Sequence, residues 1–383
     1  MLALPLQRGQ SVDTVTVLKS FIVSTFGAGS ELQFDRDLRG FQKARQDAVN
    51  VIDTSGESGL DSLSVIIFQL KSMAPRLAEY EEDLKLSFSY QDAFKPTKNI
   101  RCKSLYYDLS TFLWNFAALH SHIGSRVDRA TDDGIRSANK HFQVAAGSLD
   151  WIRDHCIPNM QDEGHFGPIN PPALRMMSML MLAQAQLCFY EKAVRDRKAG
   201  VMKAAIVAKL AAQTSLHYKS TMDLSKQTGC VSYVDISWSH HAEFQYKCFQ
   251  AAAEYWQSQS AKEEATNRGS GYGEEIARLI RSAKFLSLAL EFAQKNKLGV
   301  SLTNGAAGLQ RTVDVAKVSA ENDNRRVYME VVPDDNSLVP IQPVAMAKPI
   351  QPSEYTGNKT VKIQIFKTYH TTTYIAKKNY NCI

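Results

Sequence analysis

Helical periodicity is the feature that most restricts how this chain can fold. From residue 12 to residue 323, apolar residues recur at spacings of three and four, as they do on an α-helix with one buried face. Prolines are almost absent from the long periodic segments, so these segments can stay helical along their length. The pattern predicts a mostly α fold, with helices over 12–26, 31–53, 60–79, 101–128, 132–155, 171–196, 202–224, 235–262, 271–296 and 301–323.

Two of these segments make more specific predictions. Along 271–296, Leu279 and Leu286 fall on one apolar stripe, whereas Arg278 and Arg281 are expected to face solvent. Segment 176–187 is apolar almost all round, which predicts an inner helix. Small residues between successive helices favour stacked helical hairpins, although the strict period of about 34 residues that marks tetratricopeptide repeats is absent.

Composition places the chain among globular proteins. It has 383 residues, of which 44% are hydrophobic and 22% are charged, and this is enough apolar material for a large core. The most apolar stretch, 176–182, is shorter than the roughly 20 residues that a membrane-spanning helix needs. The six cysteines include no CxxC pair, which favours a reducing compartment, so a cytoplasmic protein is expected.

The C-terminal residues differ from the helical body. Residues 324–355 hold five prolines and lose the helical period, so they are expected to lie extended along a folded surface. Residues 356–383 hold five lysines and no acid, which predicts a disordered basic tail. Five of the six formal net positive charges therefore lie in the tail, and the near-neutral body gives no reason to expect nucleic-acid binding.

Searches for catalytic and metal-binding motifs return no match. The sequence contains neither a phosphate-binding GxxxxGK[ST] loop nor an HExxH pair. The pair His155 and Cys156 resembles the start of a tyrosine-phosphatase loop, but that chemistry needs an arginine six residues after the cysteine, where Asp162 stands. The glycine-rich run 269–273 lacks a preceding strand and predicts an inter-helix turn. We therefore expect no enzyme, no cofactor and no metal.

Eight short segments carry a resemblance when they are taken together. They are RQDAVN (45–50), SFSYQDAF (87–94), LWNFAALHSHIG (113–124), DDGIRSANKHFQVAAGSLDWIRDH (132–155), MLMLAQAQLCFYEKAVRD (179–196), KAAIVAKLAAQ (203–213), GYGEEIARL (271–279) and VYMEVVPD (327–334). As a collinear set over about 1–352, they resemble the BRO domain (Bro-one) family of ALIX-like modules. The NFAALHS part of 113–124 and the AAGSLDWIRDH part of 132–155 look closest to the His-domain tyrosine phosphatase branch of that family.

The resemblance implies a fold beyond what periodicity predicts. It implies an elongated, curved helical module with tetratricopeptide-like hairpins, a small N-terminal β-sheet and an extended C-terminal segment packed along the body. Residues 1–12 and parts of 50–95 are expected to supply the sheet. The BRO domain is accordingly expected over 1–355, and the basic tail over 356–383.

The resemblance also implies a function. Modules of this family bind the C-terminal amphipathic helix of an ESCRT-III subunit and are recruited to endosomes in the multivesicular body pathway. The positions that match the family's hydrophobic patch are Phe189, Ile206 and Leu210, and the flanking polar contacts match Asp132 and Lys140. Membrane association would then be peripheral and mediated by partners, and the module itself would be a non-catalytic adaptor.

Spacing alone favours simpler roles for the same residues. Phe189, Ile206 and Leu210 then read as ordinary core residues, Asp132 as a helix N-cap and Lys140 as a solvated lysine.

Two further possibilities come from the resemblance. Tyr328 matches a family tyrosine that is phosphorylated and recognised by the SH2 domain of a kinase, although Arg325 and Arg326 depart from the family pattern there. The rhophilin-like branch suggests the alternative function, a helical scaffold for a small GTPase or kinase pathway.

Overall fold

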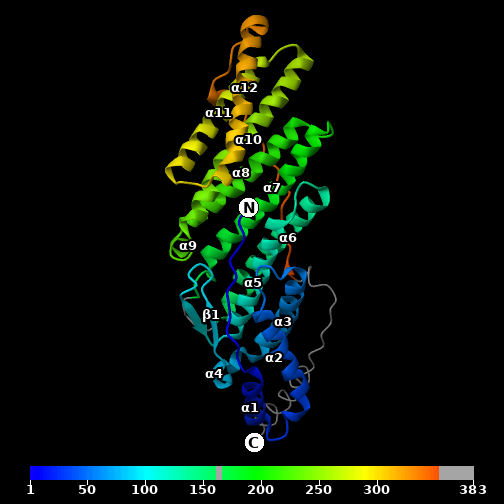
Figure 1. The fold of residues 1–383 in the computed structure, drawn as a ribbon, viewed down its shortest axis with the longest axis vertical. Coiled ribbons are helices and arrows are strands. Elements are labelled where there is room, and N and C mark those ends of the chain that lie inside the picture. The colour runs from blue at the N-terminus through cyan, green and yellow to red at the C-terminus, as the bar shows by residue number, and fades with distance from the viewer. Residues whose placement is uncertain (161–165, 353–383) are drawn as a thin grey trace, which may run out of the picture. The chain divides into compact units, whose positions relative to one another are not determined.

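The computed structural model describes residues 1–160 and 166–352, and its helices and strands are shown in Figure 1. The chain forms two compact units. Of the described residues, the sheet-bearing unit contains 2–125, 147–160, 166–175 and 350–352, and the hairpin unit contains residue 1, 126–146 and 176–349. Residues 353–383, including the predicted tail, lie outside the described residues. The prediction of a disordered tail therefore stays a prediction.

The sheet-bearing unit is built mainly of helices. They are α1 (Thr14–Phe26), α2 (Asp35–Val49), α3 (Gly56–Leu77), the short α4 (Glu81–Leu84) and α5 (Leu105–Arg126). Helix α5 is buried on nearly all of its faces, and Trp114 and Phe116 are among its fully buried side chains. A helix that is apolar all round needs neighbours on every side, so α5 is the core element of this unit.

A small antiparallel sheet precedes α5. Strands β1 (Phe88–Gln91) and β2 (Asn99–Cys102) pair in the register Phe88↔Cys102, and an isolated bridge joins Gly9 to Tyr90. The expected sheet is confirmed, and β1 and Gly9 lie within the ranges predicted to supply it. Strand β2 was not predicted. Its last two residues were assigned to the start of a helix over 101–128. Four residues that run straight into a helix are too few to show a strand period.

A buried ion pair joins the sheet to the helices of this unit. The guanidinium of Arg45 on α2 lies 2.8 Å from a carboxylate oxygen of Asp108 on α5, and both side chains are almost fully buried. Tyr90 of β1 donates its hydroxyl to the same carboxylate at 2.5 Å. Because each charged group has several partners, the cost of taking the charges out of water is offset at this site.

The hairpin unit contains the remaining helices. They are parts of α6 (Asp132–Trp151) and α7 (Pro171–Lys198), together with α8 (Ala204–Ser225), α9 (Thr228–Val231), α10 (Ile236–Arg268), α11 (Tyr272–Lys295) and α12 (Val300–Asp323). Helix α10 packs against α8 and α11, and α11 packs against α12, as Figure 1 shows. The predicted stack of helical hairpins is confirmed, and so is the burial of 176–187 in α7.

The last two helices, α11 and α12, pack through apolar residues that repeat along α12. On α12, Ala306, Val313 and Ala320 are buried, and they pack with Leu279 and Leu286 of α11 in one core cluster. This seven-residue repeat is the pattern of helices that pack side by side at a shallow angle. The apolar stripe predicted on 271–296 is therefore the packing surface of α11.

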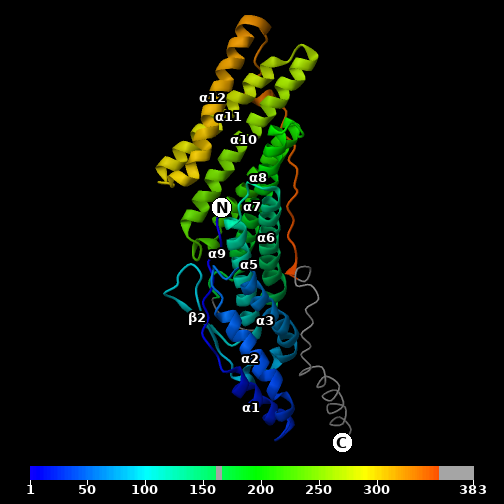
Figure 2. The same ribbon diagram turned by 45° about the vertical axis from the view of Figure 1, so that its right-hand side comes forward.

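An extended segment follows α12. Residues 324–328 form a π-helical turn, and residues 329–349, which we call the strap, run without regular structure apart from a short 3₁₀ turn at Asp335–Ser337. Figure 2 shows the strap beside α6, α7 and α8. The prediction of an extended C-terminal segment that lies along a folded surface is confirmed.

Helix side chains hold the strap mainly through its backbone. The buried amide of Gln186 on α7 donates to the carbonyl of Val344 at 2.9 Å and accepts from the backbone N–H groups of Met346 and Ala347. On α6, Gln143 accepts from the N–H of Lys348 at 2.9 Å. These bonds satisfy the polar backbone of a segment that forms no ladder of its own.

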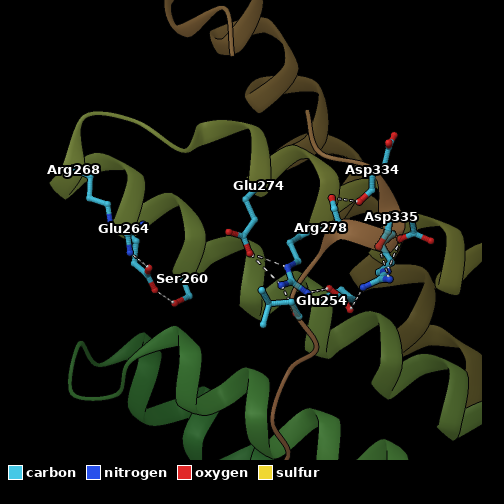
Figure 3. Close-up of polar contacts among 11 residues, drawn as sticks. Glu254, Ser260, Glu264, Arg268, Glu274, Arg278, Asp334 and Asp335 are labelled. Carbon is cyan, nitrogen blue, oxygen red and sulfur yellow. Dashed lines mark hydrogen bonds and ion pairs between the residues drawn. The ribbon is translucent and has the colours of Figure 1, made fainter. Parts of the chain in front are cut away.

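The strap also explains why one sequence prediction was wrong. Arg278 on α11 was expected to face solvent, but it is only 1% exposed and lies between Glu274 and Glu254 (Figure 3). Its Nη2 donates to the carbonyl of Val339 at 2.7 Å. Arg281, also predicted to face solvent, bonds Asp335 of the strap. The strap therefore covers a face that the helix pattern alone marks as solvent-exposed.

Candidate partner-binding patch

The predicted patch residues come from α7 and α8. Phe189 lies in the last third of α7, and Ile206 and Leu210 lie in the first two turns of α8. Helix α7 ends at Lys198 and α8 begins at Ala204, so the connection between them is 199–203. Gly200 has φ +79°, a left-handed conformation that glycine adopts without strain and that allows this short reversal.

The structure places two of the three predicted residues in one apolar cluster. Leu210 is 6% exposed and forms the buried centre of the cluster with Ala193 and Val207, and the half-buried Phe189 packs against it. Ile206 lies one helical turn before Leu210 and is 41% exposed. Of the three predicted residues, Ile206 is therefore exposed, Phe189 is half-buried, and Leu210 belongs to the core of the cluster.

Helix α10 supplies a support that sequence reasoning missed. Trp256 packs against the cluster, and its Nε1 donates to the hydroxyl of Tyr190 at 3.1 Å. Burial raises the pKa of Tyr190 to about 12, so this phenol stays neutral at any physiological pH. Phe249 meets the Tyr190 ring edge-on. The adjacent aromatic pair at 189–190 is the only signal that could have pointed to this support.

The predicted polar contact Asp132 already has partners in the structure. Its carboxylate, at the start of α6, lies 2.6 Å from a guanidinium nitrogen of Arg195 and 3.5 Å from the Nζ of Lys192, both on α7. Lys192 first, and then Arg195, lower the pKa of Asp132. Arg195 also donates to the carbonyl of Arg129. Asp132 is therefore part of a charged bridge between α6 and α7.

The second polar contact lies further along α6. Lys140 follows Asp132 by about two helical turns and is exposed. Asp132 and Lys140 thus place opposite charges on one helix beside the hairpin that carries Phe189, Ile206 and Leu210.

Tyr328 belongs to a different site, at the π-helical turn after α12. Its ring stacks on that of Tyr272, with centroids 3.5 Å apart and planes 7° from parallel. A hydrogen bond with Tyr272 raises the pKa of Tyr328. A small cavity of about 50 Å³ beside the stack is lined by both rings and by Lys262, Glu275 and Asp323, among others. Tyr328 therefore packs on the first residue of α11, and its phosphorylation stays a prediction.

Two features that the motif searches singled out have structural settings. The thiol of Cys156 is buried in the sheet-bearing unit, and burial raises its pKa to about 12. The glycine-rich run 269–273 contains the predicted turn between α10 and α11, at 269–271, and its last two residues begin α11. Among the described residues, no helix combines the length and apolar character that crossing a membrane requires.

These observations define a class of protein: a domain of stacked helical hairpins with a two-stranded sheet, a strap and a half-exposed apolar patch on one hairpin. The chain belongs to the BRO1-like domain family, whose model matches residues 1–370. The resemblance found in the sequence is therefore confirmed. The domain boundary expected at 355 lies outside the described residues and stays a prediction.

Curated relatives come from fungi and vertebrates. The chain is 29% identical to the pH-response regulator protein palA/RIM20 of Emericella nidulans, over 93% of this chain and 40% of the relative. It is 30% identical to the programmed cell death 6-interacting protein of Mus musculus, over 90% of this chain and 38% of the relative. The chain therefore spans about two fifths of the length of these relatives.

Solved structures share the fold. A structure described as an ALIX BRO1 CHMP4C complex matches with a TM-score of 0.80 and 28% identity, over 92% of this chain and 95% of that one. ALIX in complex with a viral late domain also gives 0.80 and 28%, over 96% of this chain and 50% of that one. A Bro1 domain, 18% identical with a TM-score of 0.77, shares the fold over 93% of this chain and 94% of that one.

Proposed function

We propose that this domain is a non-catalytic adaptor that binds the C-terminal amphipathic helix of an ESCRT-III subunit. The observation that carries the proposal is the exposure of Ile206 one helical turn before Leu210, which lies in the buried cluster that Phe189 packs against. The fold match to the ALIX BRO1 CHMP4C complex supports a partner of this kind. Through such a partner, the domain would be recruited to endosomes in the multivesicular body pathway.

The patch has the physical features of a helix-binding surface. An amphipathic helix binds through apolar side chains spaced three and four residues apart, which need a rigid apolar surface to contact. Ile206 and Phe189 present such a surface, and Trp256 and Tyr190 hold it in place from behind. Because the supporting side chains are already packed, little ordering is needed when the partner binds.

The charged residues beside the patch would orient the partner. Lys140 is exposed and can pair with an acidic group on the helix. Asp132 is already paired with Arg195, so its first role is to hold α6 against α7. We assign it a contact to the partner as a second role. Charges at the edge of an interface govern association rate and orientation more than affinity.

Calorimetric titration with a peptide of the CHMP4C C-terminal helix tests the proposal. Ile206→Asp should weaken binding by roughly 2 kcal/mol or more, about thirtyfold, because it places a charge in the centre of the contact. Leu216→Asp is the matched control, since Leu216 lies on the same helix, is 44% exposed and is outside the apolar cluster.

Two results would overturn the proposal. One is the absence of binding by the unmodified protein, and the other is equal binding by the Ile206→Asp and Leu216→Asp variants. Leu210→Asp should also abolish binding, but Leu210 is buried and the variant must first be shown to fold. Far-ultraviolet circular dichroism and the thermal unfolding midpoint of each variant provide that check.

A further inference from the structure

A second site is suggested by a groove in the sheet-bearing unit, on helices that take no part in the patch. The groove lies between α1 and α2 and has a volume of about 670 Å³. Ligand sites of this size are common in proteins, at roughly 300 to 1,000 Å³. Its lining comprises Val15, Thr16 and Lys19 of α1 and Arg39, Gln42, Lys43, Gln46 and Asp47 of α2.

Positive charge is in excess at one end of this groove. Lys19 and Arg39 both pair with the carboxylate of Asp35, Arg39 through its Nε at 2.8 Å. Lys43 lies one helical turn beyond Arg39 and has no acidic partner among the described residues. Lys19, Arg39 and Lys43 thus stand against two carboxylates, Asp35 and Asp47, which leaves one positive charge in excess. An anion placed between Arg39 and Lys43 would gain two charged contacts.

The wall between the two helices is held rigid. Gln42 accepts hydrogen bonds from the backbone N–H of Thr14 at 2.7 Å and from the Thr14 hydroxyl at 2.6 Å. Its amide nitrogen donates to the carbonyl of Val12 at 2.9 Å. The two helices that carry Lys19 and Arg39 are thus held together before any ligand arrives, which lowers the ordering cost of binding.

We propose that this groove binds a phosphorylated polyol, with its phosphate between Arg39 and Lys43. Guanidinium and ammonium groups are the side chains that suit a phosphate monoester. Thr16 and Gln46 line the same groove and offer neutral hydrogen-bonding groups for the hydroxyls of a polyol ring. Free inositol phosphates and the headgroups of phosphorylated inositol lipids share this chemistry. The proposal is independent of the patch on α7 and α8.

The test uses the full chain with inositol trisphosphate in calorimetry, and with phosphatidylcholine vesicles that contain or lack a phosphatidylinositol phosphate. The double variant with Arg39→Gln and Lys43→Gln should bind inositol trisphosphate about tenfold or more weakly, because two charge-assisted contacts are lost. Arg36→Gln is the control, because Arg36 is an exposed arginine of α2 outside the groove lining. All substituted side chains are exposed, so the variants should fold.

The outcomes separate the two ligand sources. Binding of inositol trisphosphate without sedimentation on the lipid-containing vesicles supports a soluble ligand at this site, whereas binding in both assays supports a lipid headgroup. The proposal is overturned if neither probe binds. It is also overturned if Arg36→Gln lowers affinity as much as the double variant does, since binding would then follow overall charge.

Discussion

The buried guanidinium of Arg278 on α11 donates a 2.7 Å hydrogen bond to the carbonyl of Val339 in the strap. The same side chain pairs with Glu254 on α10 at 3.0 Å. Arg278 thus joins α10, α11 and the strap that covers them. Because its guanidinium is buried, these contacts also offset the free-energy cost of removing the charge from water.

Replacing this arginine should loosen the strap. Arg278→Met leaves the Val339 carbonyl and Glu254 short of donors, and loss of a buried pair of this kind costs about 3 kcal/mol. We expect a lower thermal unfolding midpoint and faster amide hydrogen exchange across 335–344. Lys284→Met, an exposed position on the same helix, is the control. Unchanged exchange in the Arg278 variant would show that the strap is held by other contacts.

A glycine tests the close approach of the strap to α11. A Cβ at Gly273 would lie 2.3 Å from the carbonyl oxygen of Val331, which real atoms do not permit. Gly273→Ala should therefore displace the start of the strap and destabilise the protein. Gly305→Ala in α12 meets nothing within 4 Å and should stabilise the helix by about 0.5 to 1 kcal/mol. Opposite shifts of the unfolding midpoint are the expected result, and a rise in both would contradict the steric argument.

The buried pair of the sheet-bearing unit should be sensitive to neutralisation. Asp108→Asn leaves Arg45 charged and almost fully buried without its counter-ion, at a cost of about 3 to 5 kcal/mol. Asp35→Asn, which removes a surface partner of Arg39, should cost far less, because solvent already screens that pair. Denaturant unfolding of both variants checks the difference, and equal losses would mean that burial is not what decides the effect.

Histidine burial predicts a loss of stability in mild acid. Burial lowers the pKa of His241 in the hairpin unit to about 4, against about 6.5 for an exposed histidine. Between these values the unfolded chain binds a proton that the folded chain does not, so stability is complete above pH 6.5 and falls as the pH drops toward 4. The full effect is about 3 kcal/mol.

His241→Phe should remove that part of the pH dependence. The side chain is 8% exposed and its ring meets that of Tyr218 edge-on, so an aromatic replacement retains much of the packing. Unfolding midpoints measured from pH 7 to pH 4 should fall less steeply in the variant. Part of the fall should remain, because burial also lowers the pKa values of His141 and His217. Parallel curves for the two proteins would contradict the assignment.

The helices were predictable because their apolar stripes carry the helical period. Segment 271–296 corresponds to α11 at Tyr272–Lys295, and 301–323 to α12 at Val300–Asp323. Helix α10 continues six residues beyond its predicted end at 262, because its last turns are polar and show no stripe. Strand β2 was missed because its short run of residues leads directly into α5.

The candidate site was only partly predictable. Spacing alone suggests that Leu210 is a core residue, and it is buried, whereas the exposure of Ile206 depends on how α7 and α10 pack around α8. The support from Trp256 comes from a helix that begins thirty residues after Ile206, and no local pattern connects the two. Arg278 was misread for the same reason, since its partner is a carbonyl of the distant strap.

The division of the chain into units has a consequence for its synthesis. Neither unit is continuous in sequence: among the described residues, the sheet-bearing unit includes 147–160 and 166–175 and, after the whole of the hairpin unit, 350–352. Domains generally fold as units, the N-terminal one first during synthesis. Here the last described residues of the sheet-bearing unit follow the strap, so their contacts can form only after the hairpin unit has been synthesised.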